Sequence, residues 1–366
     1  MKQANELHKI YTVLLLSAPI GSGHILAAEA LQQVLEQNPH IRVVHGNIFD
    51  FFPHILGQAF LKFYLWILGC CPWMYELAYK WGNRQSGSLW LRSLVNGALA
   101  RLGNGYIKSI APDAVIATHA TPAGIMGIYK RTHPELWLGA VVTDFTIHRW
   151  WLCEGVDTYF IADERLRGKI KLDASVDVQA FGIPVRQQFL HNDKKQCRSA
   201  YGWDAYSKVC LLMGGGEGLL PMEKIVASLY KQQGLHLVAV TGRNEKLAEQ
   251  LRRAYPALEV YGFREDVPQM LAAADMIITK AGGLTAAEAL SCGLELIIYK
   301  PLPGQEEGNA AFLHHYMGAC VAKSVAELSR IVSAAVGAEQ EEKAYCGKPL
   351  AAQKICNYVL EKCCNH

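Results

Sequence analysis

Apolar runs that end in glycine-rich turns and lead into helical patterns recur along the chain. The first run, Tyr11–Ala18, is followed by the turn Pro19–His24 and by helical spacing over Ile25–Glu36. Further apolar runs of strand length cover 41–47, 114–118, 139–143, 209–213, 237–241, 276–279 and 296–299. Strand patterns that alternate with helical patterns are typical of parallel sheets. The pattern therefore predicts an α/β protein.

A polar, charged run over His191–Ser207 separates two such series of strands and predicts a linker. A chain of 366 residues also exceeds the usual size of one hydrophobic core. We therefore expect a first domain over residues 1–190 and a second over residues 205–345. The tail, Ala351–Cys364, has apolar positions at helical spacing and predicts a final amphipathic helix.

The stretch Ala274–Asn309 carries much of the candidate chemistry. Its first predicted strand, 276–279, breaks at Gly282-Gly283 and is followed by helical spacing over 285–291. Thr285 as helix cap and Glu288 three residues later match a capping box. A helix that starts after two glycines offers N–H groups and a positive dipole end to a diphosphate. A simple turn followed by a cap is the alternative.

The segment PLPGQEEGN, residues 301–309, follows the next predicted strand. Two prolines and two glycines predict a rigid, turn-rich loop. It should lie at the carboxyl end of the strand, where open α/β sheets bind ligands. Amide and carboxylate side chains of this kind suit the hydroxyl groups of a sugar.

Three motifs in this stretch, TKAGGLTAAEAL, YKP and PGQEEGN, resemble the donor-site signature of a known family. It is the monogalactosyldiacylglycerol synthase and processive diacylglycerol glucosyltransferase family, MurG-like glycosyltransferases of family 28. The resemblance implies a GT-B fold: two Rossmann-like, doubly wound domains that face each other across a cleft. It also implies that a C-terminal helix within residues 346–366 packs back toward the first domain.

The same resemblance implies an inverting transfer of a hexose from a UDP-sugar to diacylglycerol. The form YKPxPGQE is more similar to the bacterial glucosyltransferases, which favours glucose. Glucose and galactose differ at one stereocentre, so the donor stays open between them here. The number of sugars added, the oligomeric state and any activation by lipid also stay open.

Two further motifs supply the candidate catalytic residues. A lone histidine after a glycine turn is more often structural, but G-S-G-H, residues 21–24, resembles the family loop that holds the proposed base, His24. TDFTIHRWW, residues 143–151, resembles another family pattern, and its Asp144 could orient or help charge a histidine. From the pattern alone, Asp144 could equally begin an Asx turn.

The donor residues follow from the glycine loops and from the resemblance. By itself a glycine run such as 214–218 is a weak signal, although such loops can donate N–H groups to phosphate. The expected contacts are the diphosphate with Gly215, Gly216, Gly283, Leu284 and Thr285, uracil with Phe263 and Arg264, ribose with Glu288, and sugar hydroxyls with Gln305, Glu306 and Asn309.

Aromatic and basic residues are concentrated between positions 51 and 110, where six lysines and arginines accompany one acid. Lys62, Pro72 and Glu76 interrupt the apolar stretch, so it does not match a membrane span. Such a composition suits an anionic membrane interface, with ordinary core helices as the alternative. The expected acceptor and membrane residues are Phe63, Trp66, Trp73, Lys62, Lys80 and Arg84.

Charge and cysteine content limit the possible partners and the cellular compartment of the protein. A net charge of +3 and the lack of a recognised motif argue against nucleic acid as a partner. The 11 cysteines are scattered without C-x-x-C, and the apolar start predicts a first strand rather than a signal peptide. We therefore expect a cytoplasmic protein bound peripherally to the inner face of the membrane. No D-x-D is present, so neither a metal nor another cofactor is expected.

Three other functions remain open at this point. A UDP-N-acetylhexosamine 2-epimerase could use the same scaffold without a lipid-binding segment. A MurG-like enzyme would transfer N-acetylglucosamine to a lipid-linked precursor. A membrane-associated nucleotide-sugar sensor without catalysis would have no need for a base such as His24.

Overall fold

The computed structural model describes residues 10–18, 22–51, 86–170, 175–204, 207–218, 220–301, 304–338 and 347–364. The chain divides into two compact units. The first contains Met1–Arg186 and Leu350–His366, and the second contains Gln187–Pro349. The first unit therefore takes in residues from both ends of the sequence.

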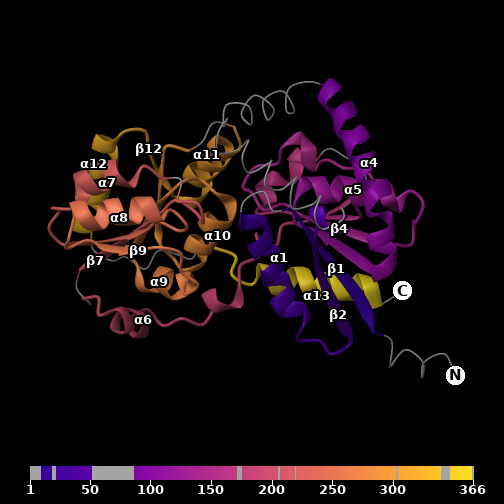
Figure 1. Ribbon diagram of the computed structural model, residues 1–366, viewed down its shortest axis with the longest axis horizontal. Helices are drawn as coiled ribbons and strands as arrows, with labels where there is room; N and C mark the ends of the chain where they lie inside the picture. Colours follow the sequence, from indigo (N-terminus) through magenta and orange to yellow (C-terminus); the bar gives the residue numbers. More distant parts are fainter. Residues whose placement is uncertain are drawn as a thin grey trace. The chain divides into compact units, whose positions relative to one another are not determined.

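The first unit is built on a six-stranded parallel sheet with the strand order β2-β1-β3-β4-β5-β6. Figure 1 labels its strands β1, β2 and β4. Its strands are β1 (Tyr11–Ser17), β2 (Ile41–Asn47), β3 (Ala114–Ala117), β4 (Trp137–Val141), β5 (Thr158–Phe160) and β6 (Asp177–Gln179). Its helices are α1 (Ser22–Leu35), α4 (Ser86–Ile110), α5 (Ala120–Lys130) and α13 (Ala351–Cys364), with short 3-10 helices η2 (Ile48–Phe51), η3 (Arg149–Trp151) and η4 (Glu164–Lys169).

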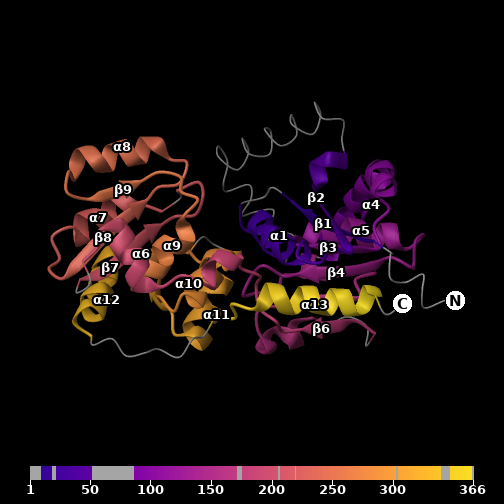
Figure 2. The same ribbon diagram turned by 90° about the horizontal axis from the view of Figure 1, so that it is seen from below.

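Apolar residues on both sides of this sheet are buried, as parallel strands require. Alternate residues of β1, Val13 and Leu15, join a core cluster with residues of α1 and α13, such as Leu31 and Ile355. On the other side, α5 lies against β3 and β4, and α4 packs on α5. Figure 2 shows α13, in yellow, lying along the sheet of this unit. The tail therefore completes the core of the first unit.

The second unit also contains a six-stranded parallel sheet, with the order β12-β11-β10-β7-β8-β9. Its strands are β7 (Lys208–Met213), β8 (Leu235–Val240), β9 (Glu259–Tyr261), β10 (Met276–Thr279), β11 (Glu295–Tyr299) and β12 (Cys320–Ala322). Its helices are α6 (Lys194–Tyr201), α7 (Met222–Leu229), α8 (Glu245–Ala254), α9 (Val267–Ala273), α10 (Gly283–Ser291), α11 (Gln305–Met317) and α12 (Val325–Gly337), with a 3-10 helix η5 (Gln187–Phe189).

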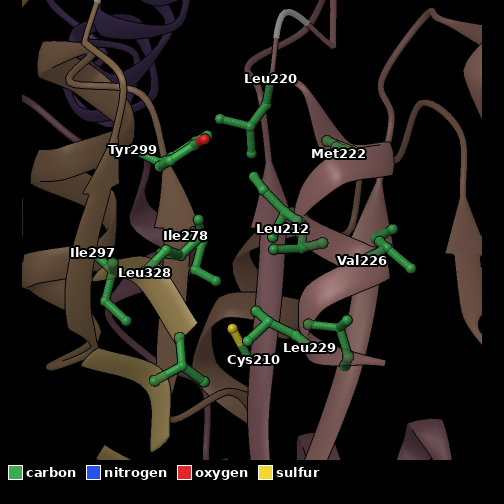
Figure 3. Close-up of a cluster of buried hydrophobic side chains, with 14 of the residues drawn as sticks. Cys210, Leu212, Leu220, Met222, Val226, Leu229, Ile278, Ile297, Tyr299 and Leu328 are labelled. Atoms are coloured by element: carbon green, nitrogen blue, oxygen red, sulfur yellow. The ribbon is translucent and has the colours of Figure 1, made fainter. Parts of the chain in front are cut away.

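One face of the second sheet is covered by α7, α8 and α12. Side chains of β7, β10 and β11, such as Leu212, Ile278 and Ile297, interlock there with Val226 of α7 and Leu328 of α12 (Figure 3). Helices α9 and α10 contact each other, and α6 packs on α9. Both units are thus doubly wound α/β domains, and the predicted fold class is confirmed.

The predicted linker over His191–Ser207 is wrong, because this run lies within the second unit and its residues 194–201 form helix α6. Its polar residues serve buried contacts. The Arg198 guanidinium is 7% exposed; it forms an ion pair with Asp275 and donates to the Ala273 carbonyl oxygen at 2.8 Å. Lys194 also bonds Asp275, at 2.7 Å. A charged run therefore became a packed helix because its partner carboxylate lies ahead of β10.

Two predictions about the stretch Ala274–Asn309 are also wrong. Helix α10 begins at Gly283 with Gly282 as its cap, so Thr285 is not the capping residue and the expected capping box does not form. Residues 305–309 belong to α11 rather than to a loop. Gly304, at φ 98°, turns the chain into that helix, and its N–H donates to the Glu307 carboxylate at 3.0 Å. Acidic residues in the first turn favour this helix start.

Candidate active site

Each sheet reverses its strand order at one point. Of the predicted site residues, His24, Gly215 and Gly283 follow strands beside these points. Asp144, Phe263 and Gln305 follow strands further out in the same sheets. In the first sheet the reversal lies between β1 and β3, and in the second between β7 and β10. Open α/β sheets bind ligands outside such reversal points, where neighbouring loops separate.

His24 lies in the first turn of α1, directly after β1. Its Nδ1 is 2.9 Å from the carbonyl oxygen of Thr118, which follows β3, and 2.8 Å from Oγ1 of Thr143, which follows β4. The Thr118 hydroxyl in turn donates to the His24 carbonyl oxygen at 3.0 Å. A carbonyl oxygen can only accept, so Nδ1 carries the proton and the lone pair of the neutral ring is on Nε2.

His119 and His148 surround His24 but have the opposite tautomer. The His119 ring lies edge-on to that of His24, with 4.6 Å between ring centroids. The Nδ1 atom of His119 accepts from the Thr121 N–H at 3.1 Å, and that of His148 accepts from the Trp150 N–H at 3.3 Å. Their neutral rings therefore carry the proton on Nε2. Among these three histidines, His24 is the one with a basic Nε2.

Burial keeps this cluster uncharged near neutral pH. Desolvation lowers the pKa of His24 below its usual range, although the negative charge of Asp144 and the bond to Thr118 oppose the shift. Desolvation and then the neighbouring histidines lower the pKa of His119 well below that range. Desolvation, His24 and Arg92 lower the pKa of His148 to about 4. The site therefore offers a neutral imidazole beside a buried carboxylate, since Asp144 is 5% exposed.

The loop that carries His148 is fixed from α4 and β5. The Arg92 guanidinium donates to the carbonyl oxygens of Arg149, Trp150 and Leu152 at 3.0–3.2 Å. The Tyr159 hydroxyl donates to the Trp151 carbonyl oxygen at 2.7 Å. These contacts fix η3, the last three residues of TDFTIHRWW, and Leu152 after it.

In the second unit the glycine run after β7 forms a braced turn. The Gly218 N–H bonds the Gly215 carbonyl oxygen at 3.0 Å. The loop after β8 packs directly on this turn: a Cβ atom at Gly242 would lie 2.3 Å from the Gly216 oxygen, and one at Gly218 would lie 2.2 Å from the Thr241 oxygen. Both glycines have positive φ, 60° and 63°. Glycine is therefore required for the two loops to meet.

The start of α10 lies on the other side of the reversal point. Its first intrahelical bond runs from the Ala286 N–H to the Gly282 oxygen, so the N–H groups of Gly283, Leu284 and Thr285 precede the regular ladder. Glu288, one turn into the helix, is 5% exposed. The structure therefore places these residues together as a potential anion-binding edge.

Helix α11 joins this edge through two side chains. Asn309, 1% exposed, donates through Nδ2 to the Ala281 carbonyl oxygen at 3.0 Å. Glu306 accepts from the Lys280 ammonium at 2.7 Å. Gln305 is the first residue of the same helix. Asn309 thus fixes α11 to the loop after β10, and Glu306 contacts a cation, Lys280, that was not predicted as a site residue.

Phe263 and Arg264 follow β9 and make separate contacts. Phe263 is 54% exposed and lies below the Arg243 guanidinium, whose carbon is 5.0 Å from the ring centroid. Arg264 donates through Nε to Asp266 at 2.7 Å and lies over the Tyr261 ring. An exposed ring beside the glycine turns is available for stacking, whereas the Arg264 side chain is held toward Asp266.

The predicted acceptor and membrane residues, Phe63, Trp66, Trp73, Lys62, Lys80 and Arg84, lie outside the described residues. Within the described ranges no helix is both long and apolar enough to span a membrane. In the same part of the chain, no group of three or more His, Cys, Asp or Glu side chains is placed to hold a metal ion.

Comparison with known proteins matches each of the two units to a family model. Residues 24–185 match the family model of monogalactosyldiacylglycerol (MGDG) synthase, and residues 209–355 match the glycosyltransferase family 28 C-terminal domain. A processive diacylglycerol beta-glucosyltransferase of Bacillus pumilus is 30% identical over 322 residues, which cover 84% of this chain and 82% of that protein. The chain therefore belongs to the monogalactosyldiacylglycerol synthase and processive diacylglycerol glucosyltransferase family. The Bacillus licheniformis member is 29% identical over 343 residues, covering 90% and 88% of the two chains.

A solved structure of a more distantly related protein has a similar fold. MurG of Acinetobacter baumannii superimposes with a TM-score of 0.64 at 17% identity, covering 96% of this chain and 99% of that one. The family member described here therefore has the GT-B fold, which is the fold predicted from its donor motif. At this identity the likeness extends to the fold and not to the substrate.

Several residues at the two sites of this family member were not predicted from the sequence. Thr118, Thr143 and His119 follow β3 and β4, the strands nearest to His24 on that side of the reversal point. Lys280 stands between β10 and the glycine turn. Each directly follows a strand or lies within two residues of one, and that position was the signal that could have identified them.

Proposed function

We propose that this glycosyltransferase transfers a hexose, glucose, from a UDP-sugar to the free hydroxyl of diacylglycerol, with inversion at the anomeric carbon. The relatives named for diacylglycerol beta-glucosyl transfer support the acceptor and the sugar, and they give less support to a MurG-like N-acetylglucosaminyl transfer. The observation that carries the proposal is the hydrogen bond from His24 Nδ1 to Thr118, since it leaves Nε2 as a base.

In this mechanism His24 takes the proton of the acceptor hydroxyl through Nε2. Its neutral form predominates near pH 7 because burial lowers its pKa. Asp144 then stabilises the imidazolium that forms, because its negative charge favours the protonated ring. Thr118 and Thr143 hold the ring in place. Each role rests on a contact in the first unit.

The residues of the second unit would bind the donor. Gly215, Gly216 and the first N–H groups of α10 would hold the diphosphate, with the helix dipole behind them. Phe263 would stack on uracil, Glu288 would bind the ribose and Gln305 and Glu306 would contact the sugar. Asn309 would act through the position of α11, because its amide is already bonded to Ala281.

The acceptor implies an anionic membrane surface as a partner, reached from the cytoplasmic side. The basic and aromatic surplus between positions 51 and 110 supports this proposal. We also propose that no metal ion takes part, because the chain lacks the D-x-D pair that commonly holds magnesium in glycosyltransferases. Transfer should then persist in the presence of a chelator, and its complete loss would refute this point.

The test is UDP release from UDP-glucose and from UDP-galactose, with diacylglycerol in anionic vesicles and with vesicles that lack it. The proposal predicts release that depends on diacylglycerol and is faster with UDP-glucose. Faster release from UDP-galactose would correct the sugar. Release or epimerisation without any lipid acceptor would instead support the epimerase function, and binding without turnover would support a sensor.

A further inference from the structure

Lys280 lies where the two loops beside the reversal point of the second sheet meet. Its Nζ donates to Glu306 Oε1 at 2.7 Å. A Cβ atom at Gly215 would be 3.5 Å from its Cε, so the aliphatic stem runs along the glycine turn. The side chains of Lys280 and Glu306 are only 24% and 12% exposed. One cation is therefore held between the turn after β7 and the first turn of α11.

A bracing role explains this ion pair poorly. Moving two charges out of water costs about as much as their attraction returns, so a half-buried pair adds little net stability. Asn309 already ties α11 to the loop after β10 through a buried hydrogen bond. Lys280 also precedes Gly283, the first residue of α10, by only three residues, and this position points to a ligand instead.

The charges at this edge also require a cation for any anionic ligand. Glu288 is buried there and the Glu306 side chain is only 12% exposed, and a diphosphate would add negative charge close to both carboxylates. Like charges at such distances repel strongly when water is excluded. Backbone N–H groups supply partial charges, whereas Lys280 supplies a full one beside them.

We propose that Lys280 is a catalytic residue that binds the diphosphate of the donor, and that Glu306 holds its ammonium in position until the donor arrives. This inference rests on the proposed function, since it names a further residue of the same donor site. It changes the expected role of Glu306, from a residue that only contacts the sugar to one that also positions Lys280.

The step that Lys280 serves is the departure of UDP. The bond between the anomeric carbon and the β-phosphate oxygen breaks, and its electron pair goes to that oxygen. The acceptor oxygen forms the new bond to the anomeric carbon and gives its proton to His24 Nε2. The leaving diphosphate thereby gains one negative charge, which the ammonium of Lys280 stabilises.

The test is binding of UDP and of uridine to the full chain by calorimetry, with uridine measured by competition. Lys280→Met keeps the aliphatic stem and removes the charge. It should weaken UDP by about tenfold or more, the usual effect of losing a charged hydrogen bond, and should leave uridine within about twofold. Lys280→Arg should retain most of the UDP affinity. Lys224→Met is the matched control, since Lys224 is exposed on helix α7 of the same unit and belongs to none of the donor motifs.

Glu306→Gln separates a ligand-binding role from a brace. Because it frees the ammonium, it should leave UDP affinity unchanged or raise it, in the opposite direction to Lys280→Met, while kcat falls because the ammonium is no longer positioned. If both substitutions weaken UDP alike, or if Lys280→Met weakens uridine as much as UDP, the proposal is wrong and the pair is structural.

The UDP and uridine affinities are measured without an acceptor, so they separate this inference from the proposed function. Loss of UDP affinity in Lys280→Met, together with a failure to glycosylate diacylglycerol in the wild type, would support Lys280 and reject the acceptor. Unchanged UDP affinity with normal transfer to diacylglycerol would reject Lys280 and leave the proposed function intact.

Discussion

The reversal points of the two sheets have the same topology and opposite electrostatics. At the first, three histidines crowd around the start of α1, and burial depresses the pKa of each. At the second, backbone N–H groups and the Lys280–Glu306 ion pair stand at the start of α10. The doubly wound topology thus positions a ligand site at each reversal point. The side chains that follow the strands determine whether that site holds a neutral base or binds an anion.

The largest effect is expected when the proposed base of the first site, His24, is removed. His24→Ala should lower the rate of sugar transfer by about 10²-fold or more, the usual contribution of general base catalysis. UDP affinity should stay within about twofold, because the groups proposed to bind UDP belong to the other unit. Initial rates and UDP calorimetry on the same preparation measure both quantities. An equal loss in UDP affinity would mean that the two sites are not separable in function.

A matched control for that substitution is His133→Ala. His133 stacks on Tyr129 at the end of α5 and takes no part in the histidine cluster. Its removal should leave both the rate and the UDP affinity close to those of the wild type. A large loss of rate there would show that any histidine change disturbs the first unit.

The neutrality of the first site should make stability depend on pH. The pKa of His148 is about 4 in the folded chain, against a usual value of 6.5. Between these values the unfolded chain binds a proton that the folded chain excludes, so stability falls as pH drops from 6.5 to 4, by up to about 3 kcal/mol. Urea unfolding at pH 7 and pH 4.5 measures this loss.

His148→Asn should make the loss smaller, since asparagine can still accept from the Trp150 N–H but does not titrate. The variant and the wild type should then differ less at pH 4.5 than at pH 7, or the variant should become the more stable. An identical decline in both proteins would place the titration elsewhere.

The second site can be weakened structurally without touching a charge. Asn309→Ala leaves the Ala281 carbonyl oxygen without its amide partner and should lower the free energy of unfolding by about 1–3 kcal/mol. Thr285→Ala is the control at the same edge. Thr285 is not the cap of α10, so its hydroxyl should matter by less than about 0.5 kcal/mol, where a lost cap would cost about 1. Denaturant midpoints with unchanged slopes decide between these values.

The smallest effect is expected from removing the charge of Asp144, which influences the pKa of His24 in the first site. Asp144→Asn removes the charge that raises the pKa of His24, so that pKa should fall further. The acid limb of the kcat/KM profile should move to lower pH, and the rate at neutral pH should fall by less than about tenfold. A shift of that limb to higher pH would contradict the assigned role of Asp144.

The strands and the general place of both sites could be predicted from the sequence. The predicted strands at 41–47 and 276–279 match β2 and β10 residue for residue. Strand β10 is buried along its whole length, and a buried parallel strand must be apolar on both faces. The start of α10 was missed by two residues. The capping pattern offered Thr285, but Gly282 adopts the extended geometry of a cap without needing a side chain.

Other features depend on contacts that no local pattern encodes. Residues 305–309 appeared loop-like because of the prolines and glycines before them, whereas the acids of the first turn and Asn309 stabilise a helix there. The pairing of Lys280 with Glu306 joins residues 26 positions apart, and it is set by how α11 packs on the loop after β10. The tautomers of the histidines likewise depend on which carbonyl or N–H each ring meets.

The position of α13 has a consequence for biosynthesis. Residues such as Ile355 and Val359 belong to the same core as Val13 and Leu31, and the Tyr358 hydroxyl bonds Asp177. A ribosome makes the second unit, residues 187–349, before it makes this helix. The unit synthesised first must therefore wait for its last element, while the unit synthesised second already has all its strands. During translation the order of completion is the reverse of the order along the gene.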